Sequence, residues 1–324
     1  MKNKLLLTTA IASVAFAGAA FSETKIGGNL EQTFVSSSED GNNSTRGLGA
    51  EHNISLSASK DLDNGMTAKY GTILEDGNAD THYLTVGTDM VTFSVARDNG
   101  NNLSSSAIPY IGDAFTSINQ LGAITSNTLA DADYHNAEHA RVDINAAGGT
   151  ITLGYAPSTA TRVADSAVDD SGNSASALIY KGSLGIDGLS ILAGIEKGDG
   201  TGTEEDAKNK QFGAAYNFGQ FTVGVERQDT ENAADATAQV ELESTTYAVT
   251  FAATDNLSIG LYMTDTEEKV GGADSADDEE IRMVQVGYNL AGLGLSLSYA
   301  DVDNVSNVNG TDGEQFQIRT IQKF

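Results

Sequence analysis

The chain has 324 residues, with 35 glycines, 2 prolines, no cysteine and no tryptophan, and a formal net charge of -27 at pH 7. This length allows one large all-β domain or two smaller ones, and the missing cysteines exclude disulfides and most structural zinc sites. A nucleic-acid partner is excluded as well, because phosphate binding requires clusters of Lys and Arg that this acidic chain lacks.

The N-terminal segment has the pattern of a secretory signal peptide. Two lysines within the first four residues precede an apolar run from Leu5 to Ala20, and small residues lead to a cleavage site after Ser22. No segment reaches the roughly 20 apolar residues of a membrane-spanning helix. We expect residues 1–22 to be removed and residues 23–324 to form a single domain.

Residues 211–228, QFGAAYNFGQFTVGVERQ, have the clearest strand pattern in the chain. Every second residue from Phe212 to Phe218 is apolar, and the same alternation resumes at Phe221 after a two-residue turn. The residues between them are small or polar. The pattern predicts an antiparallel hairpin with one apolar and one polar face.

The same unit recurs along the chain and predicts sixteen strands. In chain order these are 24–36, 46–59, 66–75, 81–88, 91–98, 140–147, 149–157, 175–185, 188–198, 211–218, 221–228, 243–253, 257–268, 280–291, 293–303 and 314–324. The connections alternate between tight turns and long polar loops, and residues 99–139 form by far the longest loop. An outer-membrane barrel has this arrangement, whereas a soluble sandwich has no reason to place every long loop at one end.

The number of strands indicates what the polar face touches. Side chains can fill a barrel of about eight strands, whereas about 16 to 18 strands leave an aqueous channel. In strand 293–303, residues 293, 295, 297 and 299 are Leu or Tyr, whereas residues 294, 296, 298 and 300 on the other face are Gly, Ser or Ala, which is too little apolar bulk to fill so wide an interior. We predict a transmembrane, antiparallel up-and-down β-barrel, closed because open sheet edges in hydrocarbon leave backbone groups unpaired.

These features together resemble the general porin family of Gram-negative bacteria, alphaproteobacterial type. The resemblance implies that residues 99–139 fold into the lumen as a constriction loop, with loop carboxylates facing a basic cluster on the wall. Pro109 and Gly112 are similar to residues of a turn that family members often carry there, and Asp113 is the nearby candidate acid. The resemblance also implies a homotrimer, and recognition of the last strand by the outer-membrane assembly machinery through Phe324.

Alternation along the strands assigns several charged side chains to the interior. Its acidic side chains are Glu31, Glu51, Asp143, Glu196 and Glu226. We expect four interior cations to form a basic wall, namely Lys25, Lys69, Arg141 and Arg319. The loop acids expected opposite this wall are Asp113, Asp131, Asp133 and Glu138. The alternative is that these are solvated lumen residues at no common height, with less influence on which ions pass.

The sequence offers little for metal binding or catalysis. His135 and His139 are four residues apart but lack the H-E-x-x-H order, so no zinc site or hydrolase follows. We expect no cofactor. Calcium at the acidic external loops, around 204–206 and 277–280, is the one candidate ion, although these runs lack EF-hand spacing.

The expected function is passive diffusion of ions and small hydrophilic solutes across the outer membrane, with a mild preference for cations from the acidic mouth. The expected partners are lipid and lipopolysaccharide. A substrate-selective channel is the alternative within transport. A soluble acidic secreted β-protein or adhesin is another, and an outer-membrane enzyme is a further class for which four histidines give little support.

Overall fold

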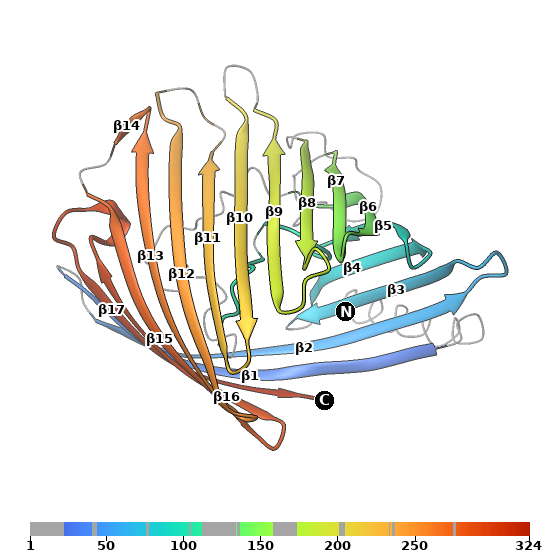
Figure 1. Ribbon diagram of the computed structural model, residues 1–324, viewed down its shortest axis with the longest axis horizontal. Coiled ribbons are helices and arrows are strands. Elements are labelled where there is room, and N and C mark those ends of the chain that lie inside the picture. The colour runs from blue at the N-terminus through green and yellow to red at the C-terminus, as the bar shows by residue number, and fades with distance from the viewer. Residues whose placement is uncertain are drawn as a thin grey trace, which may run out of the picture.

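A computed structural model describes residues 23–40, 44–75, 78–103, 105–111, 134, 137–157, 174–200, 205–232, 234, 237–274 and 277–324. These residues form one antiparallel sheet of 17 strands in which the strands follow one another in chain order (Figure 1). The last strand, β17, pairs with the first, β1, from Asn29–Lys323 to Glu39–Gly313. The sheet therefore closes on itself as a barrel.

The strand bounds confirm the sixteen predicted strands. They are β1 (Glu23–Glu39), β2 (Thr45–Asp61), β3 (Thr67–Glu75), β4 (Asn78–Gly87), β5 (Val91–Arg97), β6 (His139–Ala146), β7 (Gly149–Ala156), β8 (Ala175–Gly182) and β9 (Leu189–Gly198). They continue with β10 (Ala207–Phe218), β11 (Phe221–Glu231), β12 (Val240–Thr254), β13 (Leu257–Val270), β15 (Glu279–Leu290), β16 (Leu293–Asp303) and β17 (Gly313–Lys323). The seventeenth, β14 (Ala273–Asp274), has two residues and only extends β13 into its loop.

Several strands differ in length from the prediction. Both β1 and β2 have 17 residues, because polar residues beyond the predicted ends, such as Ser37 and Thr45, remain paired. Backbone hydrogen bonds between the strands continue beyond the membrane, where outward side chains face water and need not be apolar. Strand β8 ends earlier than predicted because Leu184 and Gly185 adopt positive φ and begin the turn to β9.

We call the two ends of the barrel the turn end and the loop end. Tight turns such as 62–66 and 147–148 lie at the turn end, and the longer connections lie at the loop end. The outer face is apolar, with Phe212 58%, Leu261 57% and Leu297 44% exposed in the single chain. Lipid is the medium in which such a face is stable.

The inner face carries polar side chains at low exposure, among them Asn209, Gln211, Ser298 and Gln317. Two apolar clusters also lie inside, one around Leu103 and Leu192 and the other around Ile108 and Ile281. Each contains a residue of the long loop. The interior is therefore packed where the loop meets the wall.

One short 3-10 helix, η3 (Val305–Asn307), lies in the last loop. Among the described residues, no helix has the length and apolarity needed to cross a membrane.

Candidate functional site

The first part of the long loop, residues 99–103 and 105–111, runs along the inner wall. The backbone N–H of Leu103 donates to Glu196 of β9 at 2.8 Å, and that of Ala107 donates to Glu226 of β11 at 2.8 Å. Further along, the N–H of Ile111 donates to Gln285 of β15 at 2.8 Å. Three inward side chains thus accept hydrogen bonds from the loop backbone, at intervals of four residues.

Neighbouring side chains add contacts along the same path. Gln211 of β10 donates to the Ser105 carbonyl at 3.0 Å, and the Tyr262 hydroxyl of β13 donates to the Pro109 carbonyl at 2.9 Å. The ring of Tyr110 stacks on Tyr262, with centroids 4.8 Å apart. Because five backbone groups of this segment hydrogen-bond to side chains of the wall, its path is fixed across most of one side of the barrel.

Glycines on the wall allow the loop to approach closely. A β-carbon at Gly213 would lie 2.5 Å from a Glu226 carboxylate oxygen and 2.9 Å from the Ala107 β-carbon. Three further wall glycines lie under loop side chains in the same way, namely Gly154, Gly194 and Gly224. These positions exclude larger side chains unless the loop moves.

The beginning of the loop is held by Arg141, which is 8% exposed. Its guanidinium donates to the Asn99 carbonyl and, at 2.9 Å, to Asp143. Thr152 of β7 donates to Asp143 at 2.7 Å and accepts from Asn101 at 3.1 Å. Arg141 therefore anchors the loop.

We name two parts of the inner face. The covered wall is the inward face of β6 to β15, which the described part of residues 99–111 contacts. The open wall is the inward face of β1 to β4, where Asn29, Glu51 and Ser55 are half-buried and Lys25 and Lys69 are exposed.

The four predicted cations fall in three separate places. Arg141 lies beneath the start of the loop, whereas Arg319 of β17 forms an ion pair with Glu31 of β1 across the closing strands. Lys25 and Lys69 line a cavity of about 250 Å³ on the open wall. The structure thus brings only the two lysines together.

The predicted loop acids are largely outside the described residues. This applies to Asp113, Asp131 and Asp133. Glu138 immediately precedes β6 and pairs with His82 of β4 at 3.0 Å. Both side chains have the outward parity of their strands, so Glu138 does not face the basic side chains of the wall.

The residues that hold the loop were only partly visible in the sequence. Alternation placed Glu196 and Glu226 inside, but it did not indicate that they bind the loop backbone. The sequence does not single out Gln285 and Tyr262. Alternation shows which face of a strand a residue is on, but not where a loop packs against that face.

Charged side chains mark the limit of the lipid-facing surface at the loop end. Outward positions on β13 are apolar up to Met263 and are then occupied by Asp265 and Glu267. Next to Met263, Arg282 of β15 pairs with Glu280 and with Asp303 of β16. An arginine surrounded by carboxylates at a strand end is stable at the headgroup level, where water is available.

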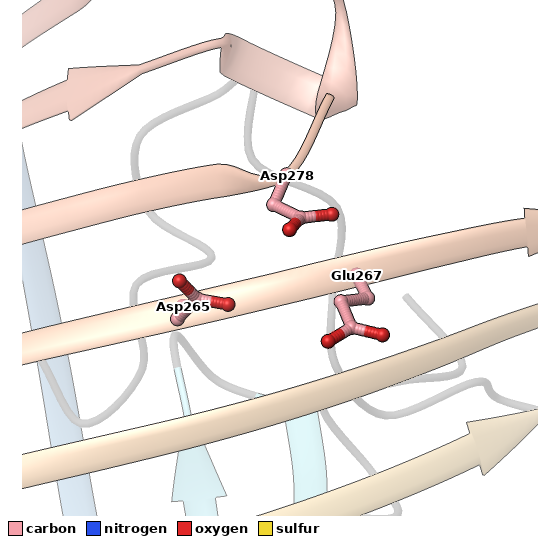
Figure 2. Close-up of side chains that lie close together, drawn as sticks. All are labelled: Asp265, Glu267 and Asp278. Atoms are coloured by element: carbon pink, nitrogen blue, oxygen red, sulfur yellow. The ribbon is translucent and has the colours of Figure 1, made fainter. Parts of the chain in front are cut away.

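Three carboxylates gather at this rim (Figure 2). Asp265, Glu267 and Asp278 offer oxygens that all lie within 4.8 Å of one another. Burial and the charges of Asp278 and Glu280 raise the pKa of Asp265 above its ordinary value. Oxygen ligands of this type suit hard divalent cations, so calcium at the acidic external loops stays a prediction for this group.

Glu279, the first residue of β15, lies beyond the lipid level because it pairs with Thr266, past Asp265. Its carboxylate is 1% exposed and accepts from the N–H of Ser306 in η3 at 2.8 Å. Burial raises the pKa of Glu279 to about 7. This carboxylate fastens the last external loop to the loop end of the covered wall.

The profile of the Gram-negative porin family matches residues 8–310, which is most of the chain. The chain belongs to the Gram-negative porin family. Membership and the closed sixteen-stranded barrel identify it as a protein of the Gram-negative outer membrane and confirm the predicted fold.

Solved structures with the same fold as this porin share little sequence with it. OmpT of Vibrio cholerae, expressed in the outer membrane, is 16% identical with a TM-score of 0.68, covering 93% of this chain and 97% of that chain. A trimer form of in-vitro folded OmpT gives 15% identity, a TM-score of 0.65, and coverage of 93% and 99%. A triple mutant of the Rhodopseudomonas blastica porin gives 18% identity, a TM-score of 0.60, and coverage of 93% and 100%. No curated protein sequence matches the porin.

Proposed function

We propose that this porin is a passive, non-catalytic diffusion channel for ions and small hydrophilic solutes, narrowed on one side by the long loop. The observation that carries this proposal is the division of the inner face. Residues 99–111 bind the covered wall, while polar side chains of the open wall keep contact with solvent. A polar lining of this kind supports a continuous column of water.

A mild cation preference follows from the same proposal. The net charge of -27 and the acidic rim raise the local cation concentration at the mouth. Salt screens exposed charges beyond about 10 Å at 0.1 M, so the preference is strongest at low ionic strength. Of the predicted constriction acids, Asp113, Asp131 and Asp133 remain in the proposal, whereas Glu138 is left out because it pairs with His82.

Conductance in a planar lipid bilayer tests the channel. The purified porin is expected to give stepwise ohmic openings, and deletion of residues 105–130 is expected to enlarge each step because that segment narrows the lumen. Deletion of residues 159–172 from another external loop is the matched control. An unchanged step after the first deletion rejects the constriction, and silence of the intact porin rejects the channel.

The porin is proposed to act as a homotrimer whose contact surface is the outer face of the strands that carry the open wall. Alongside exposed apolar residues such as Leu30 and Ile54, this face has polar or small residues at other outward positions, among them Gln32, Ala50, His52 and Thr72. The outward positions of β12 and β13 are instead Tyr247, Val249, Leu261 and Met263. Polar groups at membrane depth are more stable against a protein surface than against lipid.

Bulky substitutions on the two outer faces test the trimer. Ala50→Trp is expected to lower the temperature at which the oligomer dissociates on an unheated detergent gel, since the indole would occupy the contact surface. Ala214→Trp, on the outward face of β10, is the control that lipid accommodates. Equal dissociation temperatures for the two variants reject this contact surface.

Export and assembly complete the proposal. Residues 1–22 are proposed to be a cleaved signal peptide, and Phe324 is proposed to be read by the outer-membrane assembly machinery, with lipopolysaccharide as the lipid partner of the acidic rim. A solute-selective channel is the second candidate function. The cavity lined by Lys25 and Lys69 is the observation that favours it.

A further inference from the structure

The cavity on the open wall is lined by Lys25, Ser57, Ala58, Ser59, Lys69 and Tyr83. Two ammonium groups, two aliphatic hydroxyls and one phenol therefore surround a space of about 250 Å³. None of these described lining residues is a carboxylate, although the strand register also places Glu23 opposite Ser59 on the same face. Every polar side chain in the lining can donate a hydrogen bond, and the two lysines can only donate.

The strand register lets the two lysines reach one ligand. Lys25 of β1 pairs with Ser57 of β2, and Lys69 of β3 pairs with Ser59, two residues further along β2. Strands spaced about 4.8 Å apart and a rise of about 3.4 Å per residue put the two lysine α-carbons on the order of 12 Å apart. Side chains of this length converge from both sides of β2 over its two serine hydroxyls.

The remaining wall of the cavity is aromatic. The ring of Tyr83 covers Gly71, where a β-carbon would lie 2.4 Å from ring carbons. Glycine at this position lets the ring lie flat against the sheet beside Lys69. The tyrosine thereby closes one side of the cavity, with its hydroxyl over Gly71.

The cavity lies at the turn end, away from the contacts that hold the loop. Lys69 is in the third residue pair from the turn at 62–66, and Lys25 is the third residue of β1. The other two predicted cations are largely buried beside carboxylates, Arg141 next to Asp143 and Arg319 next to Glu31. Both lysine side chains are instead exposed, so a solute in the lumen can reach them.

We propose that Lys25 and Lys69 form a binding subsite for small multivalent oxyanions, phosphate or a dicarboxylate, at the turn end of the channel. The inference rests on the proposed channel and adds a solute class to it. Two flexible ammonium groups suit a compact doubly charged ligand, because two like charges that approach one cavity from β1 and β3 are stabilised by a shared counter-ion. In an acidic channel, the subsite gives such anions one favourable position along their path.

Competition with chloride current tests the subsite. Single channels are recorded at low ionic strength with inorganic phosphate, or in a parallel series succinate, added to either side of the bilayer at matched ionic strength. We expect concentration-dependent block by both anions, stronger from the side nearer the turn end. Lys25→Gln with Lys69→Gln is expected to weaken the block about tenfold, which corresponds to ~1.4 kcal/mol.

Lys60→Gln is the matched control, because Lys60 lies on β2 beside Ser59 but has the outward parity of the strand. Block that is equally weakened by this control, or that survives the double substitution, overturns the subsite while leaving the channel intact. Block by only one of the two anions narrows the ligand to phosphate or to carboxylates.

A binding measurement covers the case in which the porin does not conduct. The ³¹P line width of inorganic phosphate is measured with the detergent-solubilised porin and with both variants. Broadening that the lysine double variant abolishes and Lys60→Gln retains supports the subsite even if the proposed channel fails. Equal broadening with all three proteins overturns it.

Discussion

The covered wall and the open wall are built from the same residue types, yet these residues do different things. On the covered wall, Glu226 accepts from the backbone of Ala107, and Gly213 lies directly beneath the same residue. On the open wall, Glu51 accepts from Asn53 of its own strand at 2.6 Å, and a β-carbon at Gly49 would point into open space. The same residue types therefore hold the loop where it packs against the wall, and face solvent where it does not.

Substitution of the wall glycines is expected to have the largest effect on loop docking. Gly213→Leu is expected to displace the loop, because the new side chain would occupy the positions of Ala107 and the Glu226 carboxylate. Overpacking should make the free energy of loop docking less favourable by about 1–3 kcal/mol. Altered unit conductance with increased open-channel noise is the readout.

Gly49→Leu provides the comparison, since it places the same side chain on the inner face of the open wall where space is free. We expect this variant to keep the loop docked and the noise unchanged. If Gly213→Leu and Gly49→Leu give the same open-channel noise, docking of the loop does not depend on its close approach to Gly213.

The carboxylates offer a smaller perturbation of the same kind. Glu226→Gln removes the charge that accepts from Ala107 and Ser106, and we expect a loss of about 1–2 kcal/mol in loop docking. Hydrogen exchange at the Ala107 amide should become faster. Glu51→Gln, on the open wall, should leave that amide unaffected, and protection that is equal in both variants would contradict the anchoring role of Glu226.

The ion pair between Arg319 and Glu31, beside the open wall, is expected to influence the selectivity between cations and anions. Arg319→Gln leaves Glu31 without its arginine, so the reversal potential in a KCl gradient is expected to shift toward the potassium potential. Adding Glu31→Gln removes the second charge and should return the potential close to that of the unmodified porin. A potential that ignores both substitutions would show that this pair does not face the ion path.

The loop end of the covered wall is expected to respond to pH. Because the docked Glu279 has a pKa of about 7 against an ordinary value of 4.5, the docked loop holds a proton that the undocked loop releases between these values. Docking is therefore most stable below 4.5, weakens as the pH rises toward 7, and is constant above it. Burial is the main cause, and the negative charge of Glu268 adds to it.

Hydrogen exchange at the Ser306 amide, corrected for its intrinsic pH dependence, measures this effect. Protection should be greater at pH 5.5 than at pH 8, and Glu279→Gln should remove the difference. Equal protection at both pH values in the unmodified porin would contradict the titration of Glu279.

Much of the barrel could be predicted because alternation is a local property of each strand. The apolar residues around Phe212 lie outside as expected, and the sixteen strands follow the predicted order. Glu138 could also have been placed, since extending the alternation of β6 by one position gives it an outward parity. The resemblance to porins instead predicts it as one of the loop acids.

The relative positions of charges on different strands could not be obtained in this way. Lys25 and Lys69 meet only because β1, β2 and β3 pair in a particular register, and a single strand does not encode its register with a neighbour. The path of the first part of the long loop could not be predicted from the sequence either. It depends on acceptors such as Glu196 and Gln285, which lie on strands far apart in the chain.

The ion pair between Arg319 and Glu31 joins residues 288 positions apart in the chain. Such a contact cannot form during synthesis until β17 has emerged, so the ring must be sealed after every other hairpin is available. Until then both β1 and β17 present bare edges to which another chain can add. The ion pair between Arg319 and Glu31 joins the two strands that close the barrel, so it stabilises the last step of folding. Its loss should slow barrel closure in newly made chains more than it destabilises the folded barrel.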